Sequence, residues 1–464
     1  MSTRVLQVPR FSGFIPALLV TSVVPVTQVG AQVGTVRSEE KISATAGGFG
    51  GTLRDGDRLG NDLAFLGDLD GDGVGDLAVG AAEASAAGHD QGEVWIVFLN
   101  ADGTVKAETA IGEGSGGFGG GLDLSDKFGS SLASLGDLDG DGVVDLAVGA
   151  TGDDDGGDLD GFGAVWILFL NPNGSVRAKQ KISAIAGGFI GPLDRGDNFG
   201  SALTSLGDLD GDGASELAVG APFDDDGGSN LGAVWVLSLD PDGTVSSERK
   251  ISATSGFGGT LFPQGGFGRA LAFLGDLDGN RTGDLAVGLR RDDSGGADQG
   301  ALWTLFLNAD GSVRSQQKIS ASDGGFGGLL SAGDRFGSSL AGLGDRDGDG
   351  FVDLAAGAPF ADDGGSDQGA VWLLDLEGDT LPPIITCPTS RWGVVVLGHD
   401  GGAVVDYVVS VADDNDPTPA LVCSPPSGSF FPMGRKVVTC TATDAAGNVS
   451  VCAFSVLVLT IKAR

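Results

Sequence analysis

Short apolar blocks alternate with acidic, glycine-rich loops along most of the chain. Within residues 128–183 this pattern predicts four strands: FGSSLASLGD (128–137), DLAVGA (145–150), AVWILFL (164–170) and SVRAKQKIS (175–183). The third block is apolar on both faces, like a strand buried on two sides, and the fourth mixes polar and apolar residues like an outer strand. The turn NPNG (171–174) suits a tight hairpin, because glycine accepts positive φ. The pattern therefore predicts a four-stranded antiparallel sheet.

This four-strand unit recurs five times. The stretch GDLDGDGVVDLAVGA, which leads into the second strand, starts at Gly136, and related stretches start at Gly67, Gly207, Gly275 and Gly344. The steps between these starts are 69, 71, 68 and 69 residues, and a fixed period indicates a repeat architecture. Four-stranded sheets repeated around an axis form a β-propeller, which leaves few exposed strand edges. We therefore expect an all-β chain that contains a five-bladed propeller.

The ends of the repeats indicate how such a ring closes. Each internal repeat ends with a strand such as GTVSSERKIS (243–252), whereas the fifth repeat stops after AVWLLDL (370–376). The missing strand occurs near the start of the chain as GTVRSEEKIS (34–43). We therefore expect the N-terminal segment to supply the outer strand of the last blade. The alternative is an open stack of sheets, which would expose two unpaired edges.

The charge balance narrows the range of partners. The chain has 63 acidic and 27 basic residues, which gives a formal net charge of −36. Nucleic acids and anionic lipid surfaces bind basic patches, so neither they nor insertion into a membrane is expected. Cations are the natural partners. The 84 glycines do not indicate disorder, because hydrophobic residues make up 41% of the chain and occur in blocks.

The first residues resemble a secretory signal peptide. Arg4 and Arg10 precede the apolar run Phe14–Val26, and the small residues VGA follow at 29–31. We expect residues 1–31 to be this signal and the protein to be secreted or held at the cell surface. A membrane anchor is disfavoured, because Pro16 and Pro25 interrupt a run that is already short.

All four cysteines lie near the C-terminus, at Cys387, Cys423, Cys440 and Cys452. An even number of cysteines in one small region of an exported chain indicates two disulfides. A zinc site is the alternative, but no two of these cysteines form a C-x-x-C pair. We predict that Cys423 pairs with Cys440 across a hairpin and that Cys387 pairs with Cys452 between the terminal strands.

The repeated aspartate loop has the composition of a calcium site. Between Asp137 and Asp145 carboxylates occupy positions 1, 3, 5 and 9, and glycines at positions 4 and 6 permit a sharp curl. Calcium takes six to eight oxygen ligands, which such a loop supplies from its carboxylates and the carbonyl at position 7. The loop is not an EF-hand, because Val148 stands where that motif has a glutamate. The alternative is a metal-free polar turn, in which the four carboxylates would repel one another.

We expect about five Ca²⁺ ions, one in each loop. The fourth loop is the poorest, because Asn280, Arg281 and Thr282 replace an aspartate, a glycine and a small apolar residue. The expected ligands are Asp68, Asp70, Asp72, Val74, Asp76; Asp137, Asp139, Asp141, Val143, Asp145; Asp208, Asp210, Asp212, Ala214, Glu216; Asp276, Asp278, Asn280, Thr282, Asp284; and Asp345, Asp347, Asp349, Phe351, Asp353.

The repeats resemble the FG-GAP repeats of integrin α-chain propellers. The resemblance covers roughly residues 35–376 and rests on Phe-Gly, the D-x-D-x-D-G-x-x-D loop and a closing Gly-Ala-Pro, complete at 220–222 and 357–359. It implies calcium between the first two strands of a blade and ligand binding by loops on the opposite face. Integrin propellers have seven blades, so the resemblance implies a relative of integrin α chains and not an integrin chain.

The C-terminal part resembles a hyalin repeat, or HYR domain. The resemblance rests on PPIITCP (382–388) and SGSFFPMGRKVVTCTATDAAGNVSVCAFSVLVL (427–459). It implies an immunoglobulin-like β-sandwich of the kind found in extracellular and adhesion proteins. We therefore divide the chain into a signal peptide (1–31), a propeller (34–378) and an HYR domain (381–461), with Leu381-Pro382-Pro383 as a stiff linker.

The resemblances favour an adhesion or ligand-binding protein with an extracellular protein or glycan ligand, and we expect a monomer. The loops on the expected ligand face are acidic: Asp153–Asp155, Asp224–Asp226, Asp292–Asp293 and Asp362–Asp363, facing Asp57, Asp126, Asp197 and Asp334. A solvated acidic surface is the alternative there.

No enzyme is expected, because the repeats are nearly uniform and neither His89 nor His399 has a nucleophile partner. A carbohydrate-active propeller enzyme and a purely structural surface-layer protein are the other functions considered. Arg195-Gly196-Asp197 is interpreted as drift within the repeat.

Overall fold

The protein is described by a computed structural model that covers residues 39–84, 90–155, 161–363, 365–388, 394–398, 401–416 and 418–460. The expected signal peptide, residues 34–38 of the expected closing strand, His89 and His399 lie outside these ranges. The regular elements in the described ranges are all β-strands. Among them there is accordingly no helix of the length and hydrophobicity needed to cross a bilayer.

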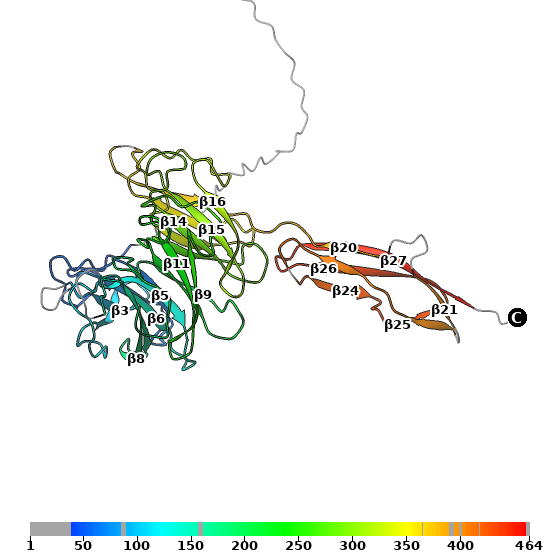
Figure 1. Cartoon of the computed structure of the whole chain (residues 1–464). Helices are drawn as coiled ribbons and strands as arrows, with labels where there is room; N and C mark the ends of the chain where they lie inside the picture. Colours follow the sequence, from blue (N-terminus) through cyan, green and yellow to red (C-terminus); the bar gives the residue numbers. More distant parts are fainter. Residues whose placement is uncertain are drawn as a thin grey trace, which may run out of the picture. The chain divides into compact units, whose positions relative to one another are not determined.

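The first four repeats each fold into a four-stranded antiparallel sheet whose strands follow chain order (Figure 1). These sheets are called the first to fourth blades, and a three-stranded sheet forms the fifth. The strands are β1 (Leu63–Gly67), β2 (Asp76–Ala81), β3 (Glu93–Leu99), β4 (Val105–Ile111); β5 (Phe128–Gly136), β6 (Asp145–Ala150), β7 (Ala164–Leu170), β8 (Val176–Ile182); β9 (Leu203–Gly207), β10 (Glu216–Ala221), β11 (Ala233–Leu239), β12 (Val245–Ser252); β13 (Leu271–Gly275), β14 (Asp284–Leu289), β15 (Ala301–Leu307), β16 (Val313–Ile319); and β17 (Leu340–Gly344), β18 (Asp353–Ala358), β19 (Ala370–Leu374). The predicted all-β architecture of propeller blades is confirmed.

Packing between neighbouring blades explains the hydrophobic pattern. All seven residues of β7 are buried, because one face of the strand packs toward the first blade and the other toward the third. The outer strand β8 exposes several of its residues. Similar apolar clusters join the third blade to the fourth and the fourth to the fifth. The continuous apolar block and the mixed block of the sequence thus correspond to an inner and an outer strand.

An aromatic pair anchors the loop that precedes each blade. In the second blade, the ring of Phe118 lies 5.0 Å from that of Trp166 on β7, with the rings edge to face. This geometry is favourable for aromatic pairs. The other blades carry the same pair, in Phe49–Trp95, Phe189–Trp235, Phe257–Trp303 and Phe326–Trp372.

The fifth blade has an open edge among the described residues. Its strands pair in the order β17-β18-β19, and described residues 39–43 belong to no strand. Val371 and Leu373 on β19 are 70% and 55% exposed. In the loop that precedes this blade, a β-carbon on Gly325 or Gly327 would meet no atom of the described residues within 4 Å. At the equivalent Gly117 of the second blade, it would lie 2.5 Å from a carbonyl of the outer strand.

The C-terminal domain forms its own β-sheets and contains two disulfide bonds. Its strands are β20 (Ile384–Thr386), β21 (Val394–Gly398), β22 (Gly402–Val405), β23 (Ser410–Ala412), β24 (Ala420–Ser424), β25 (Ser429–Pro432), β26 (Gly434–Thr443) and β27 (Val449–Thr460). They form a four-stranded sheet, β21-β27-β26-β24, and two two-stranded sheets, β20-β23 and β22-β25. Cys387 is bonded to Cys452 and Cys423 to Cys440, so both predicted pairings are confirmed.

Candidate functional site

Each aspartate loop curls around the carboxylate of its first residue. In the first blade, Asp68 accepts hydrogen bonds from the backbone N–H groups of Asp72 (2.9 Å) and Gly73 (2.8 Å). Gly71 and Gly73 have positive φ values of 79° and 88°, which explains why glycine occupies positions 4 and 6. The N–H of Val74 donates to Asp72 at 2.8 Å. The same bond from position 7 to position 5 occurs in all five loops.

The carboxylate at position 9 is buried and joins the loop to the sheet. Asp76 accepts one hydrogen bond from Leu69 N–H in the loop and one from Leu99 N–H at the end of β3, both at 3.0 Å. Asp145, Asp284 and Asp353 make the equivalent pair of bonds. Burial raises the pKa of Asp145 to about 6, of Glu216 to about 7 and of Asp284 to about 8. A nearby cation would favour the charged form of these groups.

Each aspartate loop brings three carboxylates close together. In each group an oxygen atom from every member lies within 4.8 Å of the others: Asp68, Asp70, Asp76; Asp137, Asp139, Asp145; Asp208, Asp210, Asp212; Asp276, Asp278, Asp284; and Asp345, Asp347, Asp349. Asp70 Oδ1 and Glu216 Oε1 are buried without a hydrogen-bond partner. Unsatisfied buried oxygens surrounded by other carboxylates fit a hard cation such as calcium.

Basic side chains offset part of the negative charge of some of these loops. The local sequence of the loops does not indicate these pairs. The second residue of the outer strand reaches over positions 3 and 5: Lys106 Nζ lies 2.7 Å from Asp70 Oδ2, and Arg177 pairs with Asp139 and Asp141. Arg314 pairs with Asp278 in the fourth blade. Ser246 occupies this position in the third blade. In three of the loops a basic side chain therefore offsets part of the carboxylate charge.

The unusual residues of the fourth loop make protein contacts. Asn280 donates through Nδ2 to the carbonyl of Leu307 at 2.8 Å. Arg281 donates to Asp416 Oδ2 (3.1 Å) and to Thr418 Oγ1 (2.9 Å) in the C-terminal domain. The departures from the repeat thus serve the chain's own packing, whatever the loop's affinity for a cation.

The acidic residues on the opposite loops are largely structural. Asp57, Asp126, Asp197 and Asp334 are buried, and each accepts a hydrogen bond from the backbone N–H three residues earlier. Asp153, Asp224 and Asp292 are buried as well and pair with Lys181, Lys250 and Lys318. The alternative of a wholly solvated acidic surface is therefore wrong for these residues. Asp197 of the Arg-Gly-Asp sequence is 3% exposed, which supports its interpretation as repeat drift.

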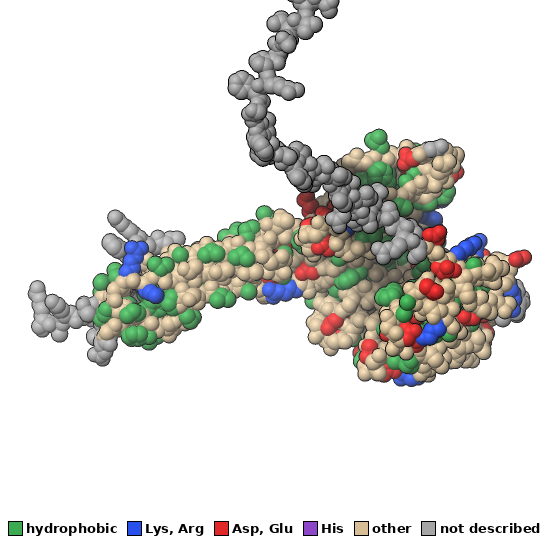
Figure 2. Space-filling model, turned by 180° about the vertical axis from the view of Figure 1, so that it is seen from behind, with side chains coloured by type: hydrophobic (Ala, Val, Ile, Leu, Met, Phe, Trp, Pro, Cys, Tyr) green, Lys and Arg blue, Asp and Glu red, His purple; other side chains and the backbone are tan. Residues whose placement is uncertain are grey.

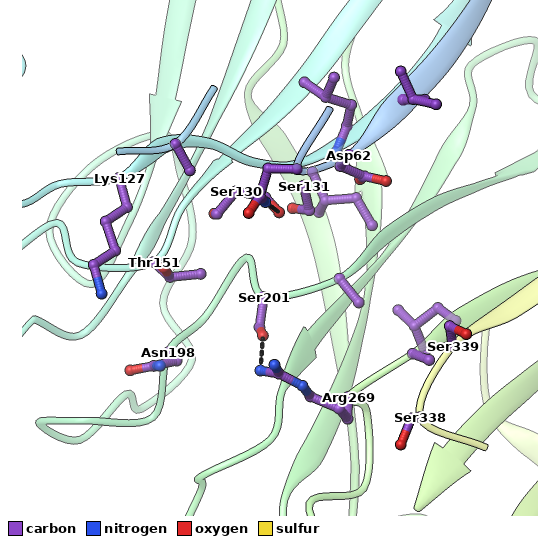
Figure 3. A pocket seen from close by; sticks show the side chains of 18 of the residues that line it. Asp62, Lys127, Ser130, Ser131, Thr151, Asn198, Ser201, Arg269, Ser338 and Ser339 are labelled. Carbon is purple, nitrogen blue, oxygen red and sulfur yellow. Dashed lines mark hydrogen bonds between the residues drawn. The ribbon is translucent and has the colours of Figure 1, made fainter. Parts of the chain in front are cut away.

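A polar pocket of about 580 Å³ is lined by residues from all five blades, and we call it the central pocket. Its polar lining consists of Arg58, Asn61, Asp62, Glu83, Lys127, Ser130, Ser131, Thr151, Asn198, Ser201, Arg269, Ser338 and Ser339. Figure 3 shows Arg269 reaching Ser201, to which it is hydrogen-bonded at 3.4 Å, with Asp62 on the opposite side of the pocket. The size is that of a small-ligand site.

Arg269 belongs to a group of four arginines on the fourth and fifth blades. Arg269 stands where other blades have Ser130, Ser201 and Ser338, and Arg290-Arg291 replaces the Pro222-Phe223 of the third blade. Burial lowers the pKa of Arg290 to about 10, and the charges of Arg269, Arg291 and Arg335 lower it too. Within the described ranges, none of these four side chains forms an ion pair. Acidic side chains are by contrast scattered over the blades in Figure 2.

The sequence carried a signal for this cluster, namely two adjacent arginines in the one repeat that departs from the pattern. The acidic loops and the overall negative charge of the chain favour cations as partners and outweigh this local basic signal. The repeat alignment alone would have placed Arg269 and Arg290 on one face of the fourth blade.

Comparison with protein families defines the class of protein. FG-GAP repeats match residues 59–97, 128–168, 199–237 and 336–374, and an HYR domain matches residues 378–458. The chain therefore contains FG-GAP repeats followed by an HYR domain, as its sequence predicts. The fourth blade, with its altered loop, lies outside the four FG-GAP matches.

Individual relatives are of two kinds. Integrin alpha-PS2 of Drosophila melanogaster is 36% identical over 172 residues, which are 36% of this chain and 12% of that protein. Phosphatidylinositol-glycan-specific phospholipase D is 36% identical over 175 residues in Rattus norvegicus (38% of this chain, 20% of that protein) and 33% identical over 188 residues in Homo sapiens (40% and 21%). The match thus spans between 12% and 21% of these relatives' length.

A crystal structure of a protein of unknown function from Bacteroides caccae is also similar. It superimposes with a TM-score of 0.33 and 14% sequence identity, over 69% of this chain and 83% of that chain.

Proposed function

We propose that this is a secreted or cell-surface protein for adhesion or ligand binding, with calcium-loaded blades and a ligand site at the central pocket. The observation that carries the ligand site is the pocket itself, whose lining draws on all five blades. Loops on a rigid scaffold are the usual location of binding residues. The integrin α relatives and the two disulfides are consistent with an extracellular location.

Calcium would be held by the five aspartate loops, each through its carboxylates and the carbonyl of its seventh residue. The bound ion would supply positive charge that offsets the carboxylates and joins the first two strands of a blade. The chain's own residues do the rest: Asp76 and its equivalents tie the loop to the sheet, and Lys106, Arg177 and Arg314 cover three loops from outside.

The lining favours an acidic glycan as the ligand. Arg269 and Lys127 supply positive charge, and serine, threonine and asparagine side chains supply hydrogen-bonding groups. Arginine binds carboxylate and sulfate groups through its planar fork of donors. Protein interfaces favour aromatic residues as well as arginine, and the pocket lining contains no aromatic side chain. A sugar bearing a carboxylate or a sulfate therefore suits this site better than a protein.

Binding suits the pocket better than catalysis does. Its two carboxylates are already engaged: Asp62 accepts a hydrogen bond from Leu132 N–H at 2.7 Å, and Glu83 pairs with Arg58 at 2.9 Å. Sugar hydrolysis requires two carboxyl groups that flank the scissile bond. The serine and threonine hydroxyls of the lining and Arg269 remain available to bind a ligand.

A glycan array probed with and without calcium tests this function. We expect retention of glycans that carry glucuronate or sulfated sugars, and little retention of their neutral counterparts. The variants Arg269→Ser and Lys127→Asn, which introduce the residues that the third blade has at these positions (Ser201 and Asn198), should weaken binding at least about tenfold, since hydrogen bonds to charged groups contribute about 1.5–3 kcal/mol. Arg249→Ser removes an exposed arginine on β12 and should bind normally. Equal binding by all three variants would exclude the pocket as the site.

A further inference from the structure

Three aspartates from distant parts of the C-terminal domain meet where the chain enters it. Asp379 precedes β20, Asp413 follows β23, and Asp444 follows β26. Asp379 and Asp444 are only 7% and 5% exposed. Asn448 is hydrogen-bonded to both Asp444 and Asp379, which places these two residues side by side. Burial raises the pKa of Asp379, and the charges of Asp413 and Asp444 raise it too.

Each of these carboxylates has one oxygen fixed by the backbone and the other unpaired. Asp379 Oδ1 accepts from Leu381 N–H at 3.0 Å, Asp413 Oδ1 from Asn415 N–H at 2.9 Å and Asp444 Oδ1 from Asn448 N–H at 2.7 Å. The Oδ2 atom of all three is buried and has no hydrogen-bond partner. An unpaired buried charge is strongly unfavourable unless something neutralises it.

Two asparagines hold the three segments in register. Asn448 donates through its backbone to Asp444 and through Nδ2 to the carbonyl of Asp379 at 3.0 Å. Asn415 donates through its backbone to Asp413 at 2.9 Å. The orientation of the three carboxylates is thus set by the fold.

We propose that Asp379, Asp413 and Asp444 form a further cation site, in the C-terminal domain and separate from the five aspartate loops, and that it takes Ca²⁺. Three carboxylate oxygens and no nitrogen or sulfur ligand suit a hard cation, and calcium tolerates an irregular set of oxygens completed by carbonyls and water. Zinc would prefer histidine or cysteine, and the four cysteines here are in disulfides.

The site would control how the linker joins the domain. Asp379 is two residues before Leu381-Pro382-Pro383, so an ion shared with Asp413 and Asp444 would fix the linker to β23 and β26. The fourth aspartate loop lies alongside: a β-carbon on Gly279 would be 3.2 Å from Asp379 Oδ2. A side chain at this position would crowd the carboxylate of Asp379.

Native mass spectrometry of the full chain with calcium tests the proposal by counting bound ions. We expect Asp413→Asn/Asp444→Asn to bind one ion fewer than the wild type, because amides keep the shape of the carboxylates but remove their charge. Asp414→Asn, which changes the exposed neighbour of Asp413, is the matched control and should bind the wild-type number. An unchanged count in the double variant would overturn the proposal.

A second measurement needs no variant. Crystals of the wild type grown with a calcium-mimicking lanthanide should give an anomalous scattering peak between the three Oδ2 atoms. Peaks confined to the aspartate loops of the blades would overturn the proposal even if the double variant failed to fold. Neither experiment involves the central pocket. Both can therefore be interpreted even if the glycan-binding hypothesis is wrong.

Discussion

Lys106 Nζ lies 2.7 Å from Asp70 Oδ2, so a lysine of the outer strand reaches into the first aspartate loop. Arg177 does the same in the second blade, while the third blade has Ser246 at this position. A loop whose carboxylates pair with a lysine or arginine side chain keeps part of its charge compensation when calcium is removed. Among the described residues the third loop has no such pair, so it should depend more on the ion than the first, second and fourth loops do.

Exchanging these side chains tests that dependence. Arg177→Ser should widen the difference in Tm between calcium and chelator, and Ser246→Arg should narrow it. Each effect should be small, because exposed ion pairs contribute little to stability. Differential scanning fluorimetry of the two variants and the wild type provides the comparison. Shifts of the same sign in both variants would contradict this account.

Removing calcium from the wild type should lower Tm substantially. A site that is filled a thousand-fold above its Kd adds about 4 kcal/mol to the folded state. Adding calcium should restore Tm more fully than adding magnesium, which prefers fewer protein ligands. Calorimetry with chelator and then with each ion checks this. If Tm did not respond to chelator, the calcium hypothesis would be wrong.

Asp139→Ala and Asp278→Ala should behave differently. Asp139 is partly exposed, so its loss should lower Tm mainly when calcium is present. Asp278 is 8% exposed and pairs with Arg314, which also donates to Asn415 O at 3.1 Å. Removing Asp278 should therefore destabilise the protein with or without calcium, whereas the sequence alone predicts that it matters least. We expect Asp278→Ala to lower the free energy of unfolding equally with and without chelator. Urea unfolding in both conditions measures this.

The stability of the calcium-free protein should fall as pH rises from about 4 to 7. Burial raises the pKa of Asp126 to about 7 and of Asp197 to about 6. Because these values exceed that of an unfolded aspartate, the folded state binds more protons in this window, and stability is lost as the groups ionise. Asp126→Asn keeps the hydrogen-bond acceptor and should reduce the slope of unfolding free energy against pH. An unchanged slope would show that Asp126 does not titrate in this range.

We propose that residues 34–43 complete the fifth blade by pairing with β19. Two observations on the described residues support this. Val371 and Leu373 on β19 are exposed, and there is space beside Gly325 and Gly327 in the preceding loop. Deleting residues 34–43 should leave β19 as a free edge and promote association. Light scattering and Tm of the deletion variant check the prediction, with deletion of residues 1–31 as the control. A monomeric variant with unchanged Tm would exclude the proposed closure.

The regular part of the fold follows from the sequence because every repeat carries the same signals. The seven buried residues of β7 and the positive φ of the loop glycines are local requirements, and each appears as a local pattern. The aspartate loops were predictable for the same reason, since their ligands lie within nine residues of one another.

The remaining sites depend on residues that the fold brings together from a distance. Nothing near Asp379 in sequence indicates that it meets Asp444, because the contact requires the C-terminal domain to be folded. The pairing of Lys106 with Asp70 likewise depends on the register between β4 and the first loop. Arg269 contributes to the central pocket only because its strand end faces those of the other blades.

The C-terminal domain continues from the fifth blade along the chain but is hydrogen-bonded to the fourth. Asp379 N–H donates to the carbonyl of Leu277 at 3.2 Å, and Arg281 is bonded to Asp416. Tension applied to the C-terminal domain would therefore be carried by two neighbouring blades, through the covalent linker to one and through backbone and side-chain hydrogen bonds to the other. A cell-surface protein under flow would in this way distribute the load before any single sheet had to bear all of it.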